Sequence, residues 1–172
     1  RKEKNFIREA DCIISLTEAG KKEILKWPAY SNSIPVQVIP CCADMDLFLQ
    51  VTAEERQAGR EKLGISRDAL VISYLGSLGS WYMLDEMLDF FVLIKKRYPG
   101  ALFLFITHSK HNLVTDLLSS RGIAASDIKI TEASRTEVPV YIKASEISLS
   151  FIKPVYSKIS SSPTKMGEIL SM

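Results

Sequence analysis

The sequence lacks any long hydrophobic run. Its most continuous apolar stretch, residues 101–106, is far shorter than the roughly 20 residues that cross a bilayer as a helix. The sequence has no secretory signal and no initiator Met, so we expect it to be a piece of a longer protein. A surplus of charge is missing too, because 22 basic and 20 acidic residues leave a net charge of +2. Nucleic-acid binding normally needs a basic surface, and we therefore expect no nucleic-acid partner.

Cysteine and histidine are also scarce. The three cysteines, Cys12, Cys41 and Cys42, do not form a disulfide framework, and adjacent cysteines rarely satisfy disulfide geometry. The lack of a disulfide framework indicates a reducing compartment, so we expect a cytoplasmic protein. Only two histidines are present and no C-x-x-C spacing occurs, so we predict no metal site.

The hydrophobic content of 47% over 172 residues is enough for a globular core. Short apolar runs alternate with helical patterns, which is typical of a parallel sheet. We therefore predict an α/β fold, a Rossmann-like parallel sheet with helices on both faces. The expected strands are 70–75, 101–106, 128–131 and 147–151, and the expected helices are 53–63, 84–98, 112–120, 136–144 and one that starts at Pro163.

A different pattern precedes this alternation. This part begins with a short apolar run over 10–16. A helix capped by Thr17 and ended by Pro28 and a strand over 36–39 then lead to Pro40. An irregular connection follows. We therefore predict a domain boundary that separates residues 1–40 from residues 41–172.

Ligands of such folds bind beyond the carboxyl ends of the strands. Three segments are expected there: 76–82, 107–111 and 157–165. Gly76 and Ser77 open a turn in which glycine lets backbone approach a ligand; a plain strand-to-helix turn is the alternative. The G-x-G-x-x-G pattern of NAD enzymes is absent. His108 follows a strand end and is either a ligand contact or a hydrogen-bonded loop residue. The serines near 150 and 160 lack G-x-S-x-G, which excludes a hydrolase.

The last helix is the other candidate site. Ser162 can cap it, and the N–H groups of its first turn, from Thr164 onward, together with the Lys165 ammonium predict a phosphate site. Glu168 lies three residues after Lys165, on the same face, where it suits ribose hydroxyls. The other face is apolar and is expected to pack on the sheet: Met166, Ile169 and Leu170. An ordinary capped helix with an exposed ion pair is the alternative.

Four segments taken in order resemble the group 1 (family 4) glycosyltransferases of the GT-B fold. Residues 10–15 resemble the start of "a-D-x-I-I-x-x-S", residues 38–48 resemble "V-I-P-N-G-V-D-x-x-x-F", and residues 74–78 and 162–168 are similar to donor-binding elements of that family. The resemblance implies two Rossmann-like domains with a cleft between them. Residues 1–40 would be the tail of the N-terminal acceptor domain and the linker, and residues 41–172 an incomplete donor domain.

The resemblance implies transfer of a sugar from a UDP- or GDP-linked nucleotide-diphosphate donor to a hydroxyl acceptor, with retention of configuration. It implies no cofactor. The acceptor would be a glycan, a lipid-linked molecule or a small molecule, in polysaccharide or glycan biosynthesis. Catalytic residues are expected partly in a missing N-terminal domain, which could contact the inner face of the membrane. The chain alone should bind donor weakly and not turn over.

The family pattern implies donor binding by six residues, with Glu168 on the ribose and the loop backbone near the diphosphate: Gly76, Ser77, Ser162, Thr164, Lys165 and Glu168. Further candidate donor contacts are Tyr82, Thr107, His108 and Ser160.

The chain departs from the family at several of these positions. Ser77 and Tyr82 stand where the family commonly has Arg and Lys, Ser160 stands at the first Glu of E-x7-E, and Cys41-Cys42 replaces the N-G of the hinge. We expect Lys165 to replace part of the lost positive charge. An inactive GT-B module that acts as an assembly partner, or another nucleotide-binding α/β domain, remains an alternative.

Overall fold

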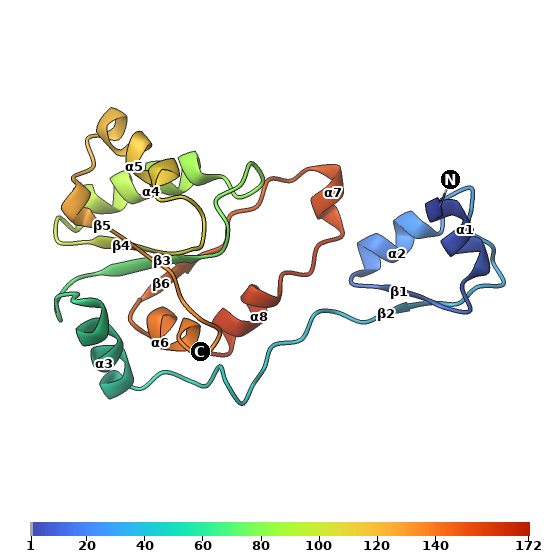
Figure 1. The fold of residues 1–172 in the computed structure, drawn as a ribbon, viewed down its shortest axis with the longest axis horizontal. Helices are drawn as coiled ribbons and strands as arrows, with labels where there is room; N and C mark the ends of the chain where they lie inside the picture. Colours follow the sequence, from blue (N-terminus) through green and yellow to red (C-terminus); the bar gives the residue numbers. More distant parts are fainter. Residues whose placement is uncertain (1) are drawn as a thin grey trace. The chain divides into compact units, whose positions relative to one another are not determined.

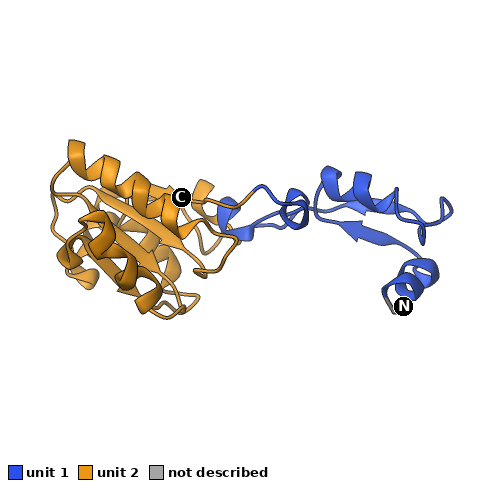
Figure 2. Cartoon of the chain, turned by 90° about the horizontal axis from the view of Figure 1, so that it is seen from above, with its two compact units in different colours: residues 1–43, 154–167 blue, residues 44–153, 168–172 orange. Residues whose placement is uncertain are grey.

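The structure is a computed structural model that describes residues 2–172 and contains two compact units (Figures 1 and 2). Unit 1 comprises residues 1–43 and 154–167, and unit 2 comprises residues 44–153 and 168–172. The boundary predicted at Pro40 lies close to the first division of the chain. The grouping of 154–167 with the N-terminal unit was not predicted. The assignment of the two parts to acceptor and donor binding stays a prediction.

Unit 1 contains a small parallel sheet. Strand β1 (Ile13–Ser15) pairs with β2 (Val36–Val38), with Ile13 opposite Val36. The helices are α1 (Lys2–Glu9), α2 (Glu18–Ile24) and the short α7 (Tyr156–Ile159). The predicted cap at Thr17 is confirmed, since its hydroxyl accepts a hydrogen bond from the Gly20 N–H at 3.0 Å. Helix α7 lies in a segment for which no helix was predicted.

Unit 2 contains a four-stranded sheet in which all neighbouring strands are parallel. The order is β5-β4-β3-β6. The strands are β3 (Val71–Leu75), β4 (Leu102–Ile106), β5 (Ile128–Thr131) and β6 (Ile147–Leu149). The predicted parallel sheet is confirmed. All four carboxyl ends lie at one edge, because every strand runs in the same direction.

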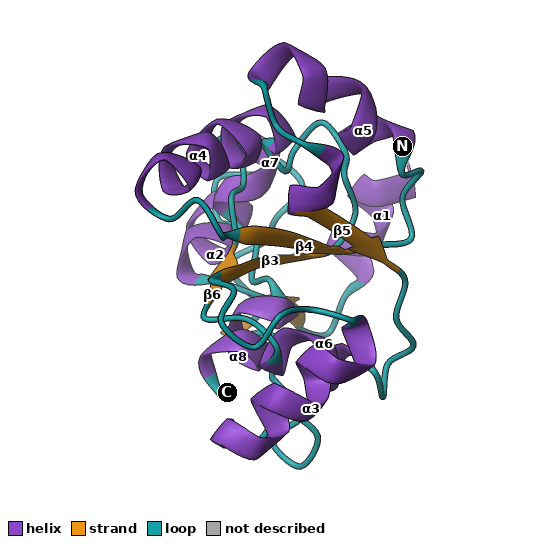
Figure 3. Ribbon diagram, turned by 90° about the vertical axis from the view of Figure 1, so that its left-hand side faces the viewer, coloured by secondary structure: helices purple, strands orange, loops and turns teal. Residues whose placement is uncertain are grey.

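Helices cover both faces of this sheet, as predicted (Figure 3). Helices α4 and α5 lie on one face, and α3 and α6 lie on the other. Their bounds are α3 (Ala53–Leu63), α4 (Leu84–Arg97), α5 (Asn112–Leu118), α6 (Val138–Lys143) and, at the end of the chain, α8 (Thr164–Leu170). Within residues 2–172, no helix is long and apolar enough to cross a membrane.

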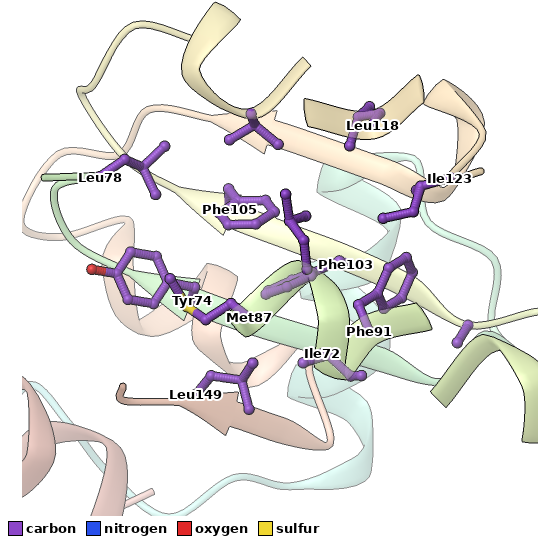
Figure 4. Packing of buried hydrophobic residues seen from close by; sticks show 13 residues of the cluster. Ile72, Tyr74, Leu78, Met87, Phe91, Phe103, Phe105, Leu118, Ile123 and Leu149 are labelled. Carbon is purple, nitrogen blue, oxygen red and sulfur yellow. The ribbon is translucent and has the colours of Figure 1, made fainter. Parts of the chain in front are cut away.

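The central strands are buried on both faces because alternate side chains point in opposite directions. Toward α4, Tyr74 packs with Phe105 and Phe103, and the rings of Phe103 and Phe105 stack at 4.1 Å between centroids (Figure 4). Toward α3 and α6, Val71 and Leu104 belong to a second cluster. Apolar side chains on both faces explain why 70–75 reads as a continuous hydrophobic run.

The buried charge of unit 2 is paired. Arg60 is 5% exposed; its Nε donates to the Ala144 carbonyl oxygen at 3.0 Å, and its Nη2 pairs with the Glu146 carboxylate. The other Glu146 oxygen accepts the Val71 N–H at 2.8 Å. This network joins α3, the first residue of β3 and the start of β6. Buried charges are tolerated when they are hydrogen-bonded in this way.

Gly59 allows close packing of α3 on α6. A Cβ at this position would lie 2.6 Å from the Val140 carbonyl oxygen, closer than real side chains come. We predict that Gly59→Ala lowers the free energy of unfolding by about 1–3 kcal/mol, as overpacking does. Helix propensity alone predicts the opposite, a gain of about 1 kcal/mol. Urea unfolding followed by circular dichroism measures the difference.

Gly100→Ala is the matched control, because a Cβ there meets nothing within 4 Å. Its free energy of unfolding should stay close to that of the wild type. A Gly59→Ala variant as stable as the wild type, or more stable, would contradict the close approach of the two helices.

Candidate functional site

Hydrogen bonds hold the turn after β3. Gly76 has a φ of +135°, which side chains with a Cβ rarely adopt. Its N–H donates to the Ile106 carbonyl oxygen at 3.0 Å. The Tyr74 hydroxyl donates to the Ser77 carbonyl oxygen at 2.8 Å, and the Leu78 N–H donates to the Ser109 hydroxyl at 2.9 Å. The positive φ fits the alternative of a plain strand-to-helix turn, and the close approach of this backbone to a ligand stays a prediction.

The turn after β4 lies beside it. Thr107 is buried; its N–H donates to the Thr131 carbonyl oxygen at 2.9 Å, and its hydroxyl accepts the Ser109 N–H at 3.0 Å. His108 is exposed, with Nδ1 at 3.3 Å from a carboxylate oxygen of Glu132. These bonds make a second well-defined wall at the carboxyl edge of the sheet.

An open cavity of about 480 Å³ lies at this edge. Four of the predicted donor contacts line it, namely Gly76, Ser77, Thr107 and His108. The remaining lining residues come from the ends of β3 and β4 and from the segment after β5: Leu75, Ile106, Ser109, Ala133, Arg135 and Val138. The structure thus brings together candidates that are distant along the chain, such as Gly76 and Thr107, which are 31 positions apart.

Arg135 supplies positive charge to this cavity. Its guanidinium Nη1 lies 2.5 Å from Oε1 of Glu168, and its Cζ lies 4.7 Å from the ring centroid of Phe48. The Arg135 side chain is 54% exposed, whereas the Glu168 side chain is 4% exposed. An aromatic face and a carboxylate therefore orient a cation whose other side is accessible.

A second cavity of unit 2 has the opposite charge. It has a volume of about 420 Å³ and lies at the start of α4, where Asp85, Glu86 and Asp116 outnumber Lys153. The carboxylates of the first turn already complement the positive end of the helix dipole. No carboxylate is among the residues of the described chain that line the first cavity. An anionic ligand is therefore favoured in the cavity of Gly76 and Arg135.

Three of the predicted phosphate-binding residues, Ser162, Thr164 and Lys165, belong to unit 1. The Ser162 hydroxyl accepts the Cys41 N–H at 3.2 Å, and Thr164 is exposed. Lys165 is half-buried, and burial lowers its pKa to about 8. The phosphate site at the start of α8 stays a prediction.

Two expectations for α8 are wrong. Glu168 is buried at 3% exposure and pairs with Arg135, so it does not belong to an exposed ion pair. Leu170 and Met166 are 79% and 38% exposed, so neither is buried on the sheet, whereas Ile169 packs against the core of unit 2 as expected. The helical pattern identified two faces of α8, but it could not show which of them is buried in the folded protein.

Two other candidate contacts have other surroundings. Tyr82 packs against the core, with its ring centroid 6.5 Å from that of Tyr74. Ser160 lines a cavity of about 310 Å³ in unit 1, together with Leu16, Trp27 and Tyr156. The Tyr156 hydroxyl of that cavity donates to the Glu23 carboxylate at 2.6 Å. The role of Tyr82 and Ser160 in donor binding stays a prediction.

Sequence reasoning missed Arg135. It considered the segments after three strands but not the one after β5, in which Arg135 lies four residues beyond Thr131. The signal was available, because every strand of a parallel sheet ends at the same edge. Among residues 2–172, no group of three or more His, Cys, Asp or Glu side chains is arranged to hold a metal ion.

Comparison with solved structures identifies the fold. The chain is similar to WaaG, a glycosyltransferase involved in lipopolysaccharide biosynthesis, with a TM-score of 0.74 and 16% identity over 92% of this chain and 41% of that one. The structure of Anabaena HepE in complex with UDP and glucose has a TM-score of 0.69 and 14% identity, over 86% of this chain and 39% of that one. The alpha,alpha-trehalose-phosphate synthase (UDP-forming) of Burkholderia vietnamiensis has a TM-score of 0.67 and 13% identity, over 99% of this chain and 45% of that one.

The predicted GT-B fold is thereby confirmed, because these neighbours are GT-B glycosyltransferases. This chain spans less than half the length of each of the three. No protein-family model matches the sequence, and no curated protein matches it.

The lowered pKa of Lys165 is measurable. We predict a titration midpoint near 8 for its Cε resonance, against about 10.4 for exposed lysines. Between these two pH values the unfolded chain holds more protons at this side chain than the folded chain, so its contribution to stability rises with pH. Lys165→Met should remove that rise. NMR of ¹³C-labelled lysine gives the midpoint, and a value of about 10.4 would contradict the burial.

Proposed function

We propose that this chain is the donor-binding part of a glycosyltransferase that transfers a sugar from a nucleotide-diphosphate sugar to a hydroxyl acceptor. The observation that carries the proposal is the open cavity of Gly76, Ser77 and Arg135, at the edge where parallel α/β sheets bind ligands. The cavity has positive charge and lies in a fold shared with glycosyltransferases, of which Anabaena HepE was solved with UDP-glucose. A diphosphate is the anionic part of such a donor.

The reaction breaks the bond between the anomeric carbon and the diphosphate oxygen and forms a bond from that carbon to the acceptor oxygen. The acceptor hydroxyl loses its proton, and the nucleoside diphosphate leaves with the electrons of the broken bond. A cation and oriented N–H groups stabilise the negative charge that develops on the leaving group. A protein nucleophile is not needed for this role, and we expect retention of configuration.

Several finer parts of the proposal concern the whole protein. We propose a UDP- or GDP-linked hexose as donor, without a further cofactor, and a glycan, lipid-linked or small-molecule acceptor in polysaccharide or glycan biosynthesis. The reaction would take place in the cytoplasm, with any membrane contact at the inner face. Acceptor binding would use residues outside this chain, which spans less than half of its structural neighbours.

Calorimetric titration of the full-length protein with UDP, GDP, ADP and NAD tests the proposal. We predict saturable binding of UDP or GDP and none of NAD. Gly76→Ala should weaken that binding at least about tenfold, because Cβ at φ +135° displaces a turn that borders the cavity.

Gly79→Ala is the matched control. Its Cβ would meet nothing within 4 Å, and Gly79 borders the acidic cavity instead, so nucleotide affinity should stay within about twofold of the wild type. Binding of NAD alone would contradict the proposal in favour of another nucleotide-binding domain. Binding of no nucleotide would favour an inactive assembly module.

A further inference from the structure

The guanidinium of Arg135 is held in place from two sides. Glu168 contacts Nη1 at 2.5 Å, and the buried Phe48 ring lies under the guanidinium plane. An arginine has five N–H donors in a rigid fork, and this contact uses the Nη1 corner of that fork. The geometry therefore fixes the plane of the guanidinium while more than half of the side chain is exposed.

Two N–H groups of the neighbouring turn are already used within the protein. The Gly76 N–H is bonded to Ile106, and the Leu78 N–H is bonded to Ser109. Among the described residues that line the cavity, Arg135 is the one lysine or arginine. His108 carries charge only when protonated and lies beside Glu132. The charge that meets an anion here must come chiefly from Arg135.

Glu168 is poorly placed to bind a ligand itself. Its side chain is 4% exposed, and one carboxylate oxygen contacts Arg135. A ribose hydroxyl could reach the second carboxylate oxygen only if the residues that cover it moved aside, because so little of the side chain is exposed. The arrangement instead suits a carboxylate that orients a cation.

We propose that Arg135 binds the diphosphate of the donor nucleotide and that Glu168 is a positioning residue for Arg135 rather than a ribose ligand. This inference rests on the proposed function, and it names the group that contacts the leaving diphosphate. Bidentate recognition of phosphate by a pre-oriented arginine is strong because little conformational freedom is lost on binding. Arg135 thereby compensates for Ser77 and Tyr82, which carry no positive charge.

The experiment compares nucleoside diphosphates with nucleosides. Binding of UDP, GDP, uridine and guanosine to the full-length protein is measured by calorimetry, or by NMR for the weak nucleosides. The variants are Arg135→Lys, Arg135→Met, Glu168→Gln and the double variant Arg135→Met/Glu168→Gln. The double variant guards against misfolding, because it does not leave a buried carboxylate without a partner. Circular dichroism confirms that each variant is folded.

We expect Arg135→Met and the double variant to lower the affinity for the diphosphate that binds by about 10- to 100-fold, the usual effect of losing charged hydrogen bonds. Nucleoside affinity should not change. Arg135→Lys should lose affinity to an intermediate extent, because it keeps the charge without the fork. Glu168→Gln should weaken diphosphate binding alone, with no additional effect when Arg135 is already Met.

Lys110→Met is the matched control for charge. Lys110 is exposed in the turn between β4 and α5 and does not line the cavity, so its loss should change diphosphate affinity by less than about twofold. A similar loss in this variant and in Arg135→Met would overturn the inference, because general electrostatics would then explain both.

Other outcomes separate the inference from the function it rests on. A wild type that binds neither UDP nor GDP would overturn the proposed function and the inference with it. A wild type that binds one of them equally well after Arg135→Met would overturn the inference alone. Loss of nucleoside affinity in Arg135→Met would show that Arg135 contacts the base or ribose, and it would overturn the inference. Loss of nucleoside affinity when Glu168→Gln is added to Arg135→Met would show the same for Glu168 and would also overturn the inference.

Discussion

Burial of β3 on both faces is the constraint on which the rest of unit 2 depends. Tyr74 faces the aromatic cluster under α4, and Val71 faces the cluster under α3 and α6. A strand enclosed by parallel neighbours and by helices can present backbone to a ligand only where it ends. Gly76, at φ +135°, is the point at which the chain leaves the core. The position of the cavity therefore follows from how the sheet is packed.

Glu168 links the packing of unit 2 to the proposed diphosphate site. A carboxylate buried to 4% exposure needs a partner, and Arg135 from the segment after β5 supplies it. The same contact aims the guanidinium at the cavity. The acidic cavity at the start of α4 shows the contrast, because there the carboxylates are in the lining itself. Charge placement, more than volume, distinguishes the two cavities of unit 2, which differ little in size.

Most of the fold could be predicted because it depends on local patterns. The alternation of apolar runs with helical periodicity identified the four strands of the sheet, and the glycine after β3 identified one wall of the cavity. The Arg135–Glu168 contact could not be predicted, because it joins residues 33 apart through tertiary packing. The exposure of Leu170 shows the same limit. Helical spacing defines faces, but only packing decides which face is covered.

The central claim is that a diphosphate binds in the cavity of Gly76, Ser77 and Arg135. A crystal structure of the protein with whichever of UDP or GDP it binds tests this most directly. The account predicts phosphate oxygens within about 3 Å of the Arg135 guanidinium, with the Glu168 contact to Arg135 retained. Phosphates bound at the start of α4, or a Glu168 carboxylate turned away from Arg135 onto the ribose, would contradict it.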